Sequence, residues 1–121
     1  MVKSYKGFES LLFRQKAKDL AVRIYSHFRD SKDFGFRDQI QRASISISNN
    51  IAEGFERNSN KELQRFLYIA KGSCGEVRNM IIIWKELWYF TEQDSKELFD
   101  LTQEISKMIS WYITKLQTNS D

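Results

Sequence analysis

Six polar side chains recur at intervals of three or four residues, which places them on one face of a helix. They are Gln39, Arg42, Ser46, Asn50, Glu53 and Arg57, and the next segment offers Glu62, Arg65, Ser73 and Glu76 as facing partners. Carboxylates that face each other across two helices could act as a general acid and base or hold a metal ion. Charges of opposite sign could instead form an ion-pair network that fixes how the two helices pack. We favour this structural role for the ten residues, which we call the polar seam.

An antiparallel hairpin that turns near residue 59 would pair positions whose numbers sum to roughly 118. This register predicts two ion pairs across the seam, Arg42 with Glu76 and Glu53 with Arg65.

Residues that usually carry catalysis or metal binding are scarce. His27 is the only histidine and Cys74 the only cysteine, and His27 lacks the Glu-x-x-His spacing of di-metal bundles. The sequence contains no glycine-rich phosphate loop, Cys-His pair or nucleophile elbow. We therefore expect no enzymatic activity, no metal and no cofactor. Cys74 falls on an apolar stripe, where we expect it to be a small buried side chain.

Positive charge is concentrated in the first part of the chain. Residues 1–71 contain 14 Lys and Arg against 8 Asp and Glu, whereas residues 72–121 contain 5 against 8. The candidate contacts for nucleic-acid phosphates are Arg14, Lys18, Arg23, Arg29, Lys32, Arg37, Arg57 and Lys61. A solvated helix face would carry many of these residues equally well. Because no helix-turn-helix, zinc finger or RNA-binding aromatic motif accompanies them, any binding would engage the backbone rather than read bases.

Four amphipathic segments position these side chains. Apolar residues at three- and four-residue intervals predict helices over about residues 11–29, 36–56, 60–89 and 92–117. Ser59 and Glu62 have the spacing of a capping box, and Thr91 can cap the last helix. Connectors of only a few residues place successive helices antiparallel. The prediction is an all-α fold, an antiparallel up-down-up-down four-helix bundle, in one domain that spans residues 1–121.

Composition agrees with one small helical domain. The chain has 121 residues, of which 41% are hydrophobic, and it contains no proline and five glycines. This is enough apolar material for one core, with few obligatory helix breaks. One cysteine requires no oxidising compartment, the first residues lack the apolar core of a signal peptide, and no apolar run approaches the about 20 residues of a membrane span. We expect a cytoplasmic protein without membrane contact.

Apolar residues outside the main stripes predict a second interface. They are Ile82 and Ile83 on the third helix and Phe99, Trp111 and Ile113 on the fourth. Single exposed apolar residues are common, but a second stripe on a helix that already faces the core favours contact between copies of the chain. Gly72 and Gly75 are expected to mark a close helix contact. We therefore expect a homo-oligomer.

The polar seam and its surroundings also resemble a known family. The shared fragments are Gln39-Ile40-x-Arg42-Ala43-Ser44-x-Ser46-Ile47, Asn50-Ile51-Ala52-Glu53-Gly54, Arg57-x-Ser59-x-x-Glu62, Phe66-Leu67-x-x-Ala70 and Gly72-Ser73-x-x-Glu76, preceded by Phe8-Glu9-x-Leu11 and Gln15-Lys16-Ala17. Together they cover nearly the whole chain and resemble the bacterial four-helix-bundle family of 23S rRNA-intervening sequence proteins. Ser48 stands where that family commonly has a proline.

The resemblance implies a scaffold rather than an enzyme. Members look like up-down bundles that assemble as pentameric rings. The accessory variability protein of diversity-generating retroelements is similar, and it uses a basic ring surface to bind nucleic acid and a reverse transcriptase. For this chain the resemblance implies a homopentamer with RNA or DNA, or a protein, as a further partner.

Two functions stay open at this point. One is an oligomer that binds the nucleic-acid backbone through a basic surface. The other is a protein-protein interaction scaffold without nucleic-acid affinity, which the surplus apolar stripes and the acidic C-terminal half would suit. A binding measurement against RNA and DNA at low salt distinguishes them.

Overall fold

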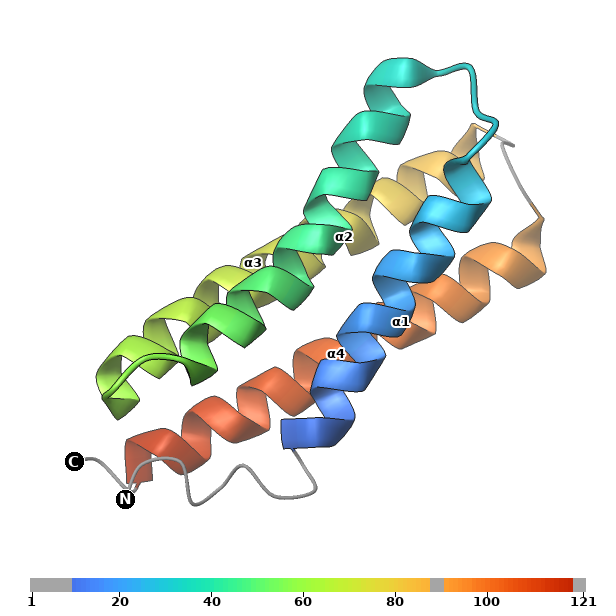
Figure 1. The fold of residues 1–121 in the computed structure, drawn as a ribbon. Helices are drawn as coiled ribbons and strands as arrows, with labels where there is room; N and C mark the ends of the chain where they lie inside the picture. Colours follow the sequence, from blue (N-terminus) through green and yellow to red (C-terminus); the bar gives the residue numbers. More distant parts are fainter. Residues whose placement is uncertain (1–9, 88–90, 119–121) are drawn as a thin grey trace.

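The computed structural model describes residues 10–87 and 91–118 of the chain. These residues form four helices and no strand (Figure 1), which confirms the predicted all-α class. The helices are α1 (Leu11–Phe28), α2 (Phe34–Phe55), α3 (Asn60–Glu86) and α4 (Glu92–Thr118). Residues 88 and 89, which the sequence assigns to the third helix, lie outside the described residues. α2 continues without a break through Ser48, the position of the family's proline.

Side-chain caps begin three of these helices. The Asp33 carboxylate accepts a hydrogen bond of 3.3 Å from the backbone amide three residues later, so α2 begins at Phe34, two residues earlier than predicted. The hydroxyls of Ser59 and Thr91 accept equivalent bonds of 3.2 and 3.1 Å. Both were predicted as caps. Each bond satisfies a backbone donor that the first turn of a helix leaves free.

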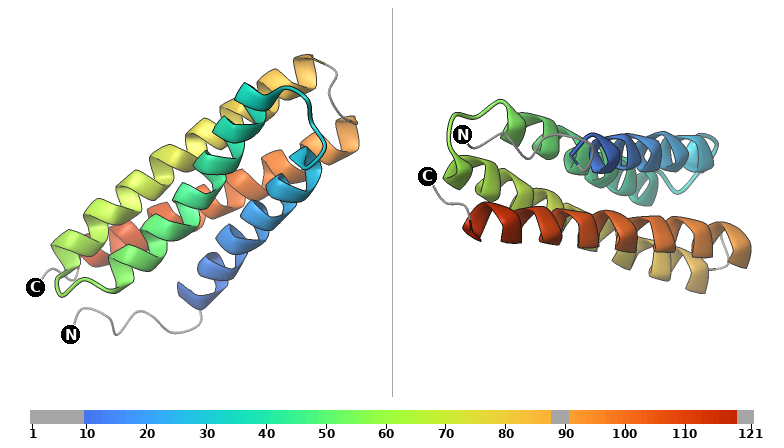
Figure 2. Two further views of the ribbon diagram at one scale, coloured as in Figure 1. Left: turned by 45° about the horizontal axis from the view of Figure 1, so that its top comes forward. Right: turned by 90° about the horizontal axis from the view of Figure 1, so that it is seen from below.

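Contacts along the helices show how they are paired. α2 packs on α1 and α3, and α4 packs on α3 and α1. In the right view of Figure 2, α1 and α2 lie on one side of the molecule and α3 and α4 on the other. Gln39, early in α2, contacts Glu76, while Ser46, later in α2, contacts the earlier Ser73 of α3. These two helices therefore run antiparallel.

Aromatic clusters close both ends of the core. At one end the rings of Phe13, Phe55 and Tyr112 meet with centroid separations of 5.4 to 6.1 Å. At the other end Phe28 of α1 lies on Trp84 of α3, with centroids 3.9 Å apart. Fully buried aliphatic side chains fill the length between them: Leu20, Ile24, Ile40, Ile47, Ile51, Leu63, Leu67, Ile105 and Ile109. The core therefore fixes α1 against α2 and α4 at one end and against α3 at the other.

The predicted second interface is only partly exposed. Ile82, Ile83 and Trp111 are 47%, 42% and 44% exposed. Phe99 is half-buried against the core. The assignment of Ile113 is wrong, because this side chain is 4% exposed and belongs to the core. It neighbours Tyr112 in the sequence, and the α4 stripe is wide enough to bury both.

The glycines of α3 do not mark a close contact, contrary to the prediction. A Cβ on Gly72 would meet no other atom of the described structure within 4 Å, and one on Gly75 would meet only the end of Arg78 at 3.8 Å. The close contact lies at Gly54 of α2. A Cβ there would lie 2.9 Å from Leu63 Cδ1 and 3.0 Å from a side-chain carbon of α3. The absence of a side chain at Gly54 therefore lets α2 and α3 approach.

We expect Gly54→Ala to lower the free energy of unfolding by about 1 kcal/mol or more, because the added methyl group overpacks a closed contact. The matched variant Gly72→Ala adds the same group to open space within a helix and should raise that free energy by about 0.5 to 1 kcal/mol. Urea denaturation followed by circular dichroism measures both. Changes of the same sign in the two variants would contradict the close approach at Gly54.

Candidate nucleic-acid interface

The polar seam lies between α2 and α3 and joins the two helices. The hydroxyls of Ser46 and Ser73 are 3.0 Å apart, and their numbers sum to 119, which agrees with the predicted register. The Asn50 amide donates to the carbonyl oxygen of Ser46 at 2.8 Å and to its hydroxyl at 3.0 Å. Gln39 donates to the carboxylate of Glu76. Neutral hydrogen bonds therefore form much of the seam.

Neither predicted ion pair across the seam forms within 4.0 Å; the pKa of Arg65 is raised by its hydrogen bond to Glu62 and, less, by the charge of Glu53. Glu76 accepts its hydrogen bond from Gln39, and no carboxylate of the described residues lies within 4.0 Å of the Arg42 guanidinium. Glu53 and Arg65 each have a nearer partner close in the sequence: Glu53 pairs with Arg57, just after α2, at 2.8 Å, and Arg65 pairs with Glu62 at 3.2 Å. Partners three or four residues apart meet without any inter-helix contact. At exposed positions such local pairs form more easily than pairs between helices.

The ion pair between Glu62 and Arg65 of α3 lowers the pKa of its carboxyl group. Arg65 donates hydrogen bonds of 3.3 and 3.2 Å to the two carboxylate oxygens of Glu62. The hydrogen bond from Arg65 lowers the pKa of Glu62 below its ordinary value. The pair is exposed, so its contribution to stability is small.

A metal site, a membrane span and a reactive thiol each require a particular arrangement of residues. Across residues 10–87 and 91–118, no three His, Cys, Asp or Glu side chains are placed to share a metal ion. None of the four helices is long and apolar enough to cross a membrane. Cys74 is buried, as predicted, and its thiol donates to the carbonyl oxygen of Thr102 at 3.0 Å. Burial raises the pKa of the Cys74 thiol to about 11, so it is protonated and a poor nucleophile at neutral pH.

Three of the eight candidate basic residues line one groove between α1 and α2. The groove has a volume of about 720 Å³. Its lining residues are Lys18, Ala21, Val22, Tyr25 and Ser26 from α1, Arg29 directly after α1, and Arg37, Gln41, Ile45, Ser48 and Asn49 from α2. We call this surface the α1–α2 groove. It contains cations, an aromatic ring and amides, and no carboxylate lines it.

Helical periodicity explains the α1 wall of this groove. Lys18, Val22, Tyr25 and Arg29 follow one another at four-, three- and four-residue steps, which places them on one face of α1. Lys18 and Arg29 are separated by about 16 Å along the helix axis, at 1.5 Å per residue. The cations therefore stand toward the two ends of the wall, with the apolar side chains between them.

The cations of the α1–α2 groove are incompletely neutralised. Arg37 pairs with Asp38 at 3.1 Å and packs over the Phe34 ring at 4.9 Å. Lys18 and Arg29 are exposed and form no ion pair with any described residue. An anion in the groove would therefore meet two cations that have no carboxylate partner.

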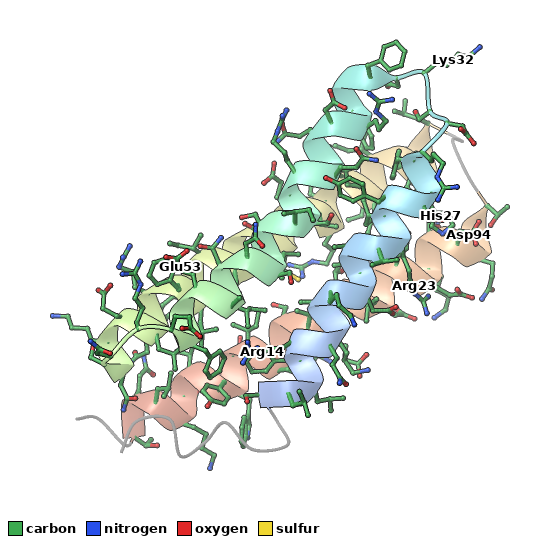
Figure 3. The ribbon with its side chains drawn as sticks, viewed as in Figure 1. Arg14, Arg23, His27, Lys32, Glu53 and Asp94 are labelled. Atoms are coloured by element: carbon green, nitrogen blue, oxygen red, sulfur yellow. The ribbon has the colours of Figure 1, made fainter. Side chains whose placement is uncertain are left out.

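The other candidates lie apart from this groove (Figure 3). Arg23 pairs with Asp19 at 3.0 Å and with Glu97 of α4 at 3.9 Å, which places it on the side of α1 that faces α4. Arg14 lies over the Phe55 ring at 5.1 Å, near the start of α1. Lys32 lies at the opposite end, on the connector between α1 and α2. The sequence therefore grouped residues that the fold separates.

The remaining two candidates lie around the α2–α3 connector. Arg57 pairs with Glu53 at 2.8 Å and packs over the Phe66 ring at 4.7 Å. Lys61 is exposed in the first turn of α3. Neither residue lines the α1–α2 groove.

A second groove, between α3 and α4, carries cations that the sequence analysis did not select. Its lining residues are Lys71, Arg78, Gln103, Ser106, Lys107 and Ser110, and its volume is about 370 Å³. No carboxylate or aromatic side chain lines it. The sequence analysis did not predict this groove, because residues 72–121 have a net negative charge. Two of their acidic residues, Glu97 and Glu104 of α4, pair with α1 and lie outside the groove.

Sequence reasoning also missed Tyr25, which is 42% exposed in the α1–α2 groove. Tyr25 lies between two core positions, Ile24 and Phe28, and is absent from the apolar stripe. Its spacing from Lys18 and Arg29 was the available indication, since all three share one helix face.

Comparisons with known proteins add a family and a fold. A family model described as 23S rRNA-intervening sequence protein matches residues 9–111. The chain is also similar to a crystal structure of a protein with unknown function from the S23 ribosomal protein family of Bacteroides thetaiotaomicron VPI-5482. The two are 26% identical with a TM-score of 0.79, over 84% of this chain and 97% of that chain. No curated protein matches the sequence.

Proposed function

Because the chain belongs to the family of 23S rRNA-intervening sequence proteins, we propose that it is a non-enzymatic, oligomeric helical bundle that binds RNA or DNA through a basic surface. The observation that carries the proposal is the α1–α2 groove, which is lined by Lys18, Arg29 and Arg37 and by no carboxylate, with Lys18 and Arg29 free of any ion pair to a described residue.

The groove suits phosphate groups for two physical reasons. An arginine guanidinium presents a planar set of donors to phosphate oxygens, and a lysine ammonium adds a point charge. Bringing phosphates to such cations releases counterions, so affinity falls steeply with salt. Contacts of this kind position a strand without reading its sequence. The expected activity is therefore salt-sensitive binding with little base preference.

The second part of the proposal is the assembly. We propose that the up-down-up-down bundle is the subunit of a homopentameric ring, as the family resemblance implies. Exposed apolar side chains on α3 support contact between copies: Ile69 is 42%, Ile82 47% and Ile83 42% exposed. A ring would repeat the α1–α2 groove and strengthen the positive potential around its circumference.

Charge reversal tests where nucleic acid binds. The double variant Lys18→Glu and Arg29→Glu should lose binding. A plot of log affinity against log salt concentration should become less steep by about 0.7 to 0.9 for each phosphate contact removed. The matched control, Lys71→Glu with Lys107→Glu, changes the net charge equally in the α3–α4 groove and should keep most of the affinity. Fluorescence anisotropy titrations of labelled RNA and DNA at several salt concentrations measure both.

Loss of binding in the control alone would move the site to the α3–α4 groove. Wild-type protein that binds neither RNA nor DNA at low salt would leave the scaffold without nucleic-acid affinity as the better account.

Solution mass tests the assembly. Light scattering should give five times the chain mass of 14.4 kDa. Ile83→Asp should dissociate the oligomer, because it places a charge in an apolar contact. Val22→Asp changes a residue that is 61% exposed on α1 and should leave the mass unchanged. A monomeric wild-type protein at micromolar concentration would contradict the ring, and dissociation by Val22→Asp alone would place the subunit contact in the α1–α2 groove.

A further inference from the structure

We propose that the α1–α2 groove binds single-stranded rather than duplex nucleic acid, with a base stacked on Tyr25 and the flanking phosphates held by Lys18 and Arg29. The inference rests on the proposed function and adds the form of the strand and the residue that selects it.

The position of Tyr25 is the first support. It lies seven residues after Lys18 and four before Arg29 on the same face of α1. At 1.5 Å per residue, the ring is about 10 Å from one cation and 6 Å from the other along the helix axis. An extended strand that passes along the wall could place a phosphate at each cation and a base between them. Single-strand binding sites combine a basic track with aromatic rings in this way.

Apolar surface beside the ring is the second support. Val22 is 61% and Ile45 37% exposed, and both line the groove with Tyr25. In a duplex the faces of the bases are stacked on one another, so its surface offers only phosphates, sugars and groove edges. An unpaired base has two free faces and gains from contact with an aromatic or aliphatic side chain. The exposed apolar centre of the groove therefore favours an unpaired strand.

Polar side chains on the opposite wall are the third support. Gln41, Ser48 and Asn49 of α2 line the groove, and none of their side chains hydrogen-bonds to another described residue. Amide and hydroxyl groups can donate to and accept from the edges of unpaired bases. The wall of α2 thus offers partners to base edges, while the wall of α1 offers the ring and the cations.

The α3–α4 groove shows what charge alone would provide. It has three cations, Lys71, Arg78 and Lys107, but no aromatic or aliphatic side chain lines it. If phosphate contacts were the whole of binding, both grooves would serve and strand form would have no effect. The ring distinguishes the α1–α2 groove from this purely ionic surface.

The test compares strand forms and ring variants. Fluorescence anisotropy follows a labelled oligouridine of about 12 nucleotides, within the range of single-strand sites, and a duplex RNA of equal length. The wild-type chain should bind the single strand more tightly. Tyr25→Ala should weaken that binding about fivefold or more, whereas Tyr25→Phe, which keeps the ring, should stay within about twofold. Duplex affinity should be unaffected by either change.

Tyr68→Ala is the matched control, because Tyr68 is 52% exposed on α3, outside both grooves. It should leave single-strand affinity unchanged, and thermal melting should confirm that every variant folds. Equal affinity for the two strand forms together with an inert Tyr25→Ala would overturn the inference, while the effect of reversing Lys18 and Arg29 would still support the proposed function. Absence of binding to any nucleic acid would overturn both. Displacement of the oligouridine by a polyglutamate peptide of equal charge would overturn the inference, because the groove would then bind any flexible polyanion and would not require a base.

Discussion

The packing of α1 against its neighbours through two buried aromatic clusters is the contact on which the candidate site depends. Phe13 meets Tyr112 at one end of α1, and Phe28 lies on Trp84 at the other. Because both ends are fixed in the core, the outer face of α1 has one orientation relative to α2. The groove between the two helices is therefore a product of core packing. Aromatic pairs in such edge-on or tilted contacts add to the stabilisation that burial gives.

The two sides of α1 differ in how their positive charges are paired. Toward α4, Lys16 pairs with Glu104 at 3.2 Å and Arg23 with Glu97 at 3.9 Å. These pairs are partly exposed, so they contribute little to stability, but they cancel positive potential on that side. Toward α2 no carboxylate lines the groove. A chain with a modest net charge of +3 can thus support a local anion site, because no carboxylate lines the groove that holds Lys18 and Arg29.

The sequence allowed prediction of features that depend on local spacing. Periodicity and capping residues such as Ser59 indicated the helices, and the register of α2 on α3 followed from a short connector. Features that depend on side-chain choice or inter-helix separation could not be predicted. Glu53 had a local partner four residues later as well as one across the seam, so the ion pair did not form between the helices. The groove required knowledge of how far α1 lies from α2, and Tyr25 became noticeable only when that distance exposed its ring.

Photo-crosslinking locates bound nucleic acid directly and tests the central claim that the α1–α2 groove is the binding surface. Single-stranded RNA containing 4-thiouridine would be irradiated in complex with the full chain, and the attached peptides identified by mass spectrometry. We predict crosslinks on residues 18–29 of α1 and 37–49 of α2, with Tyr25 among the modified positions. Crosslinks confined to α3 and α4 would contradict the account.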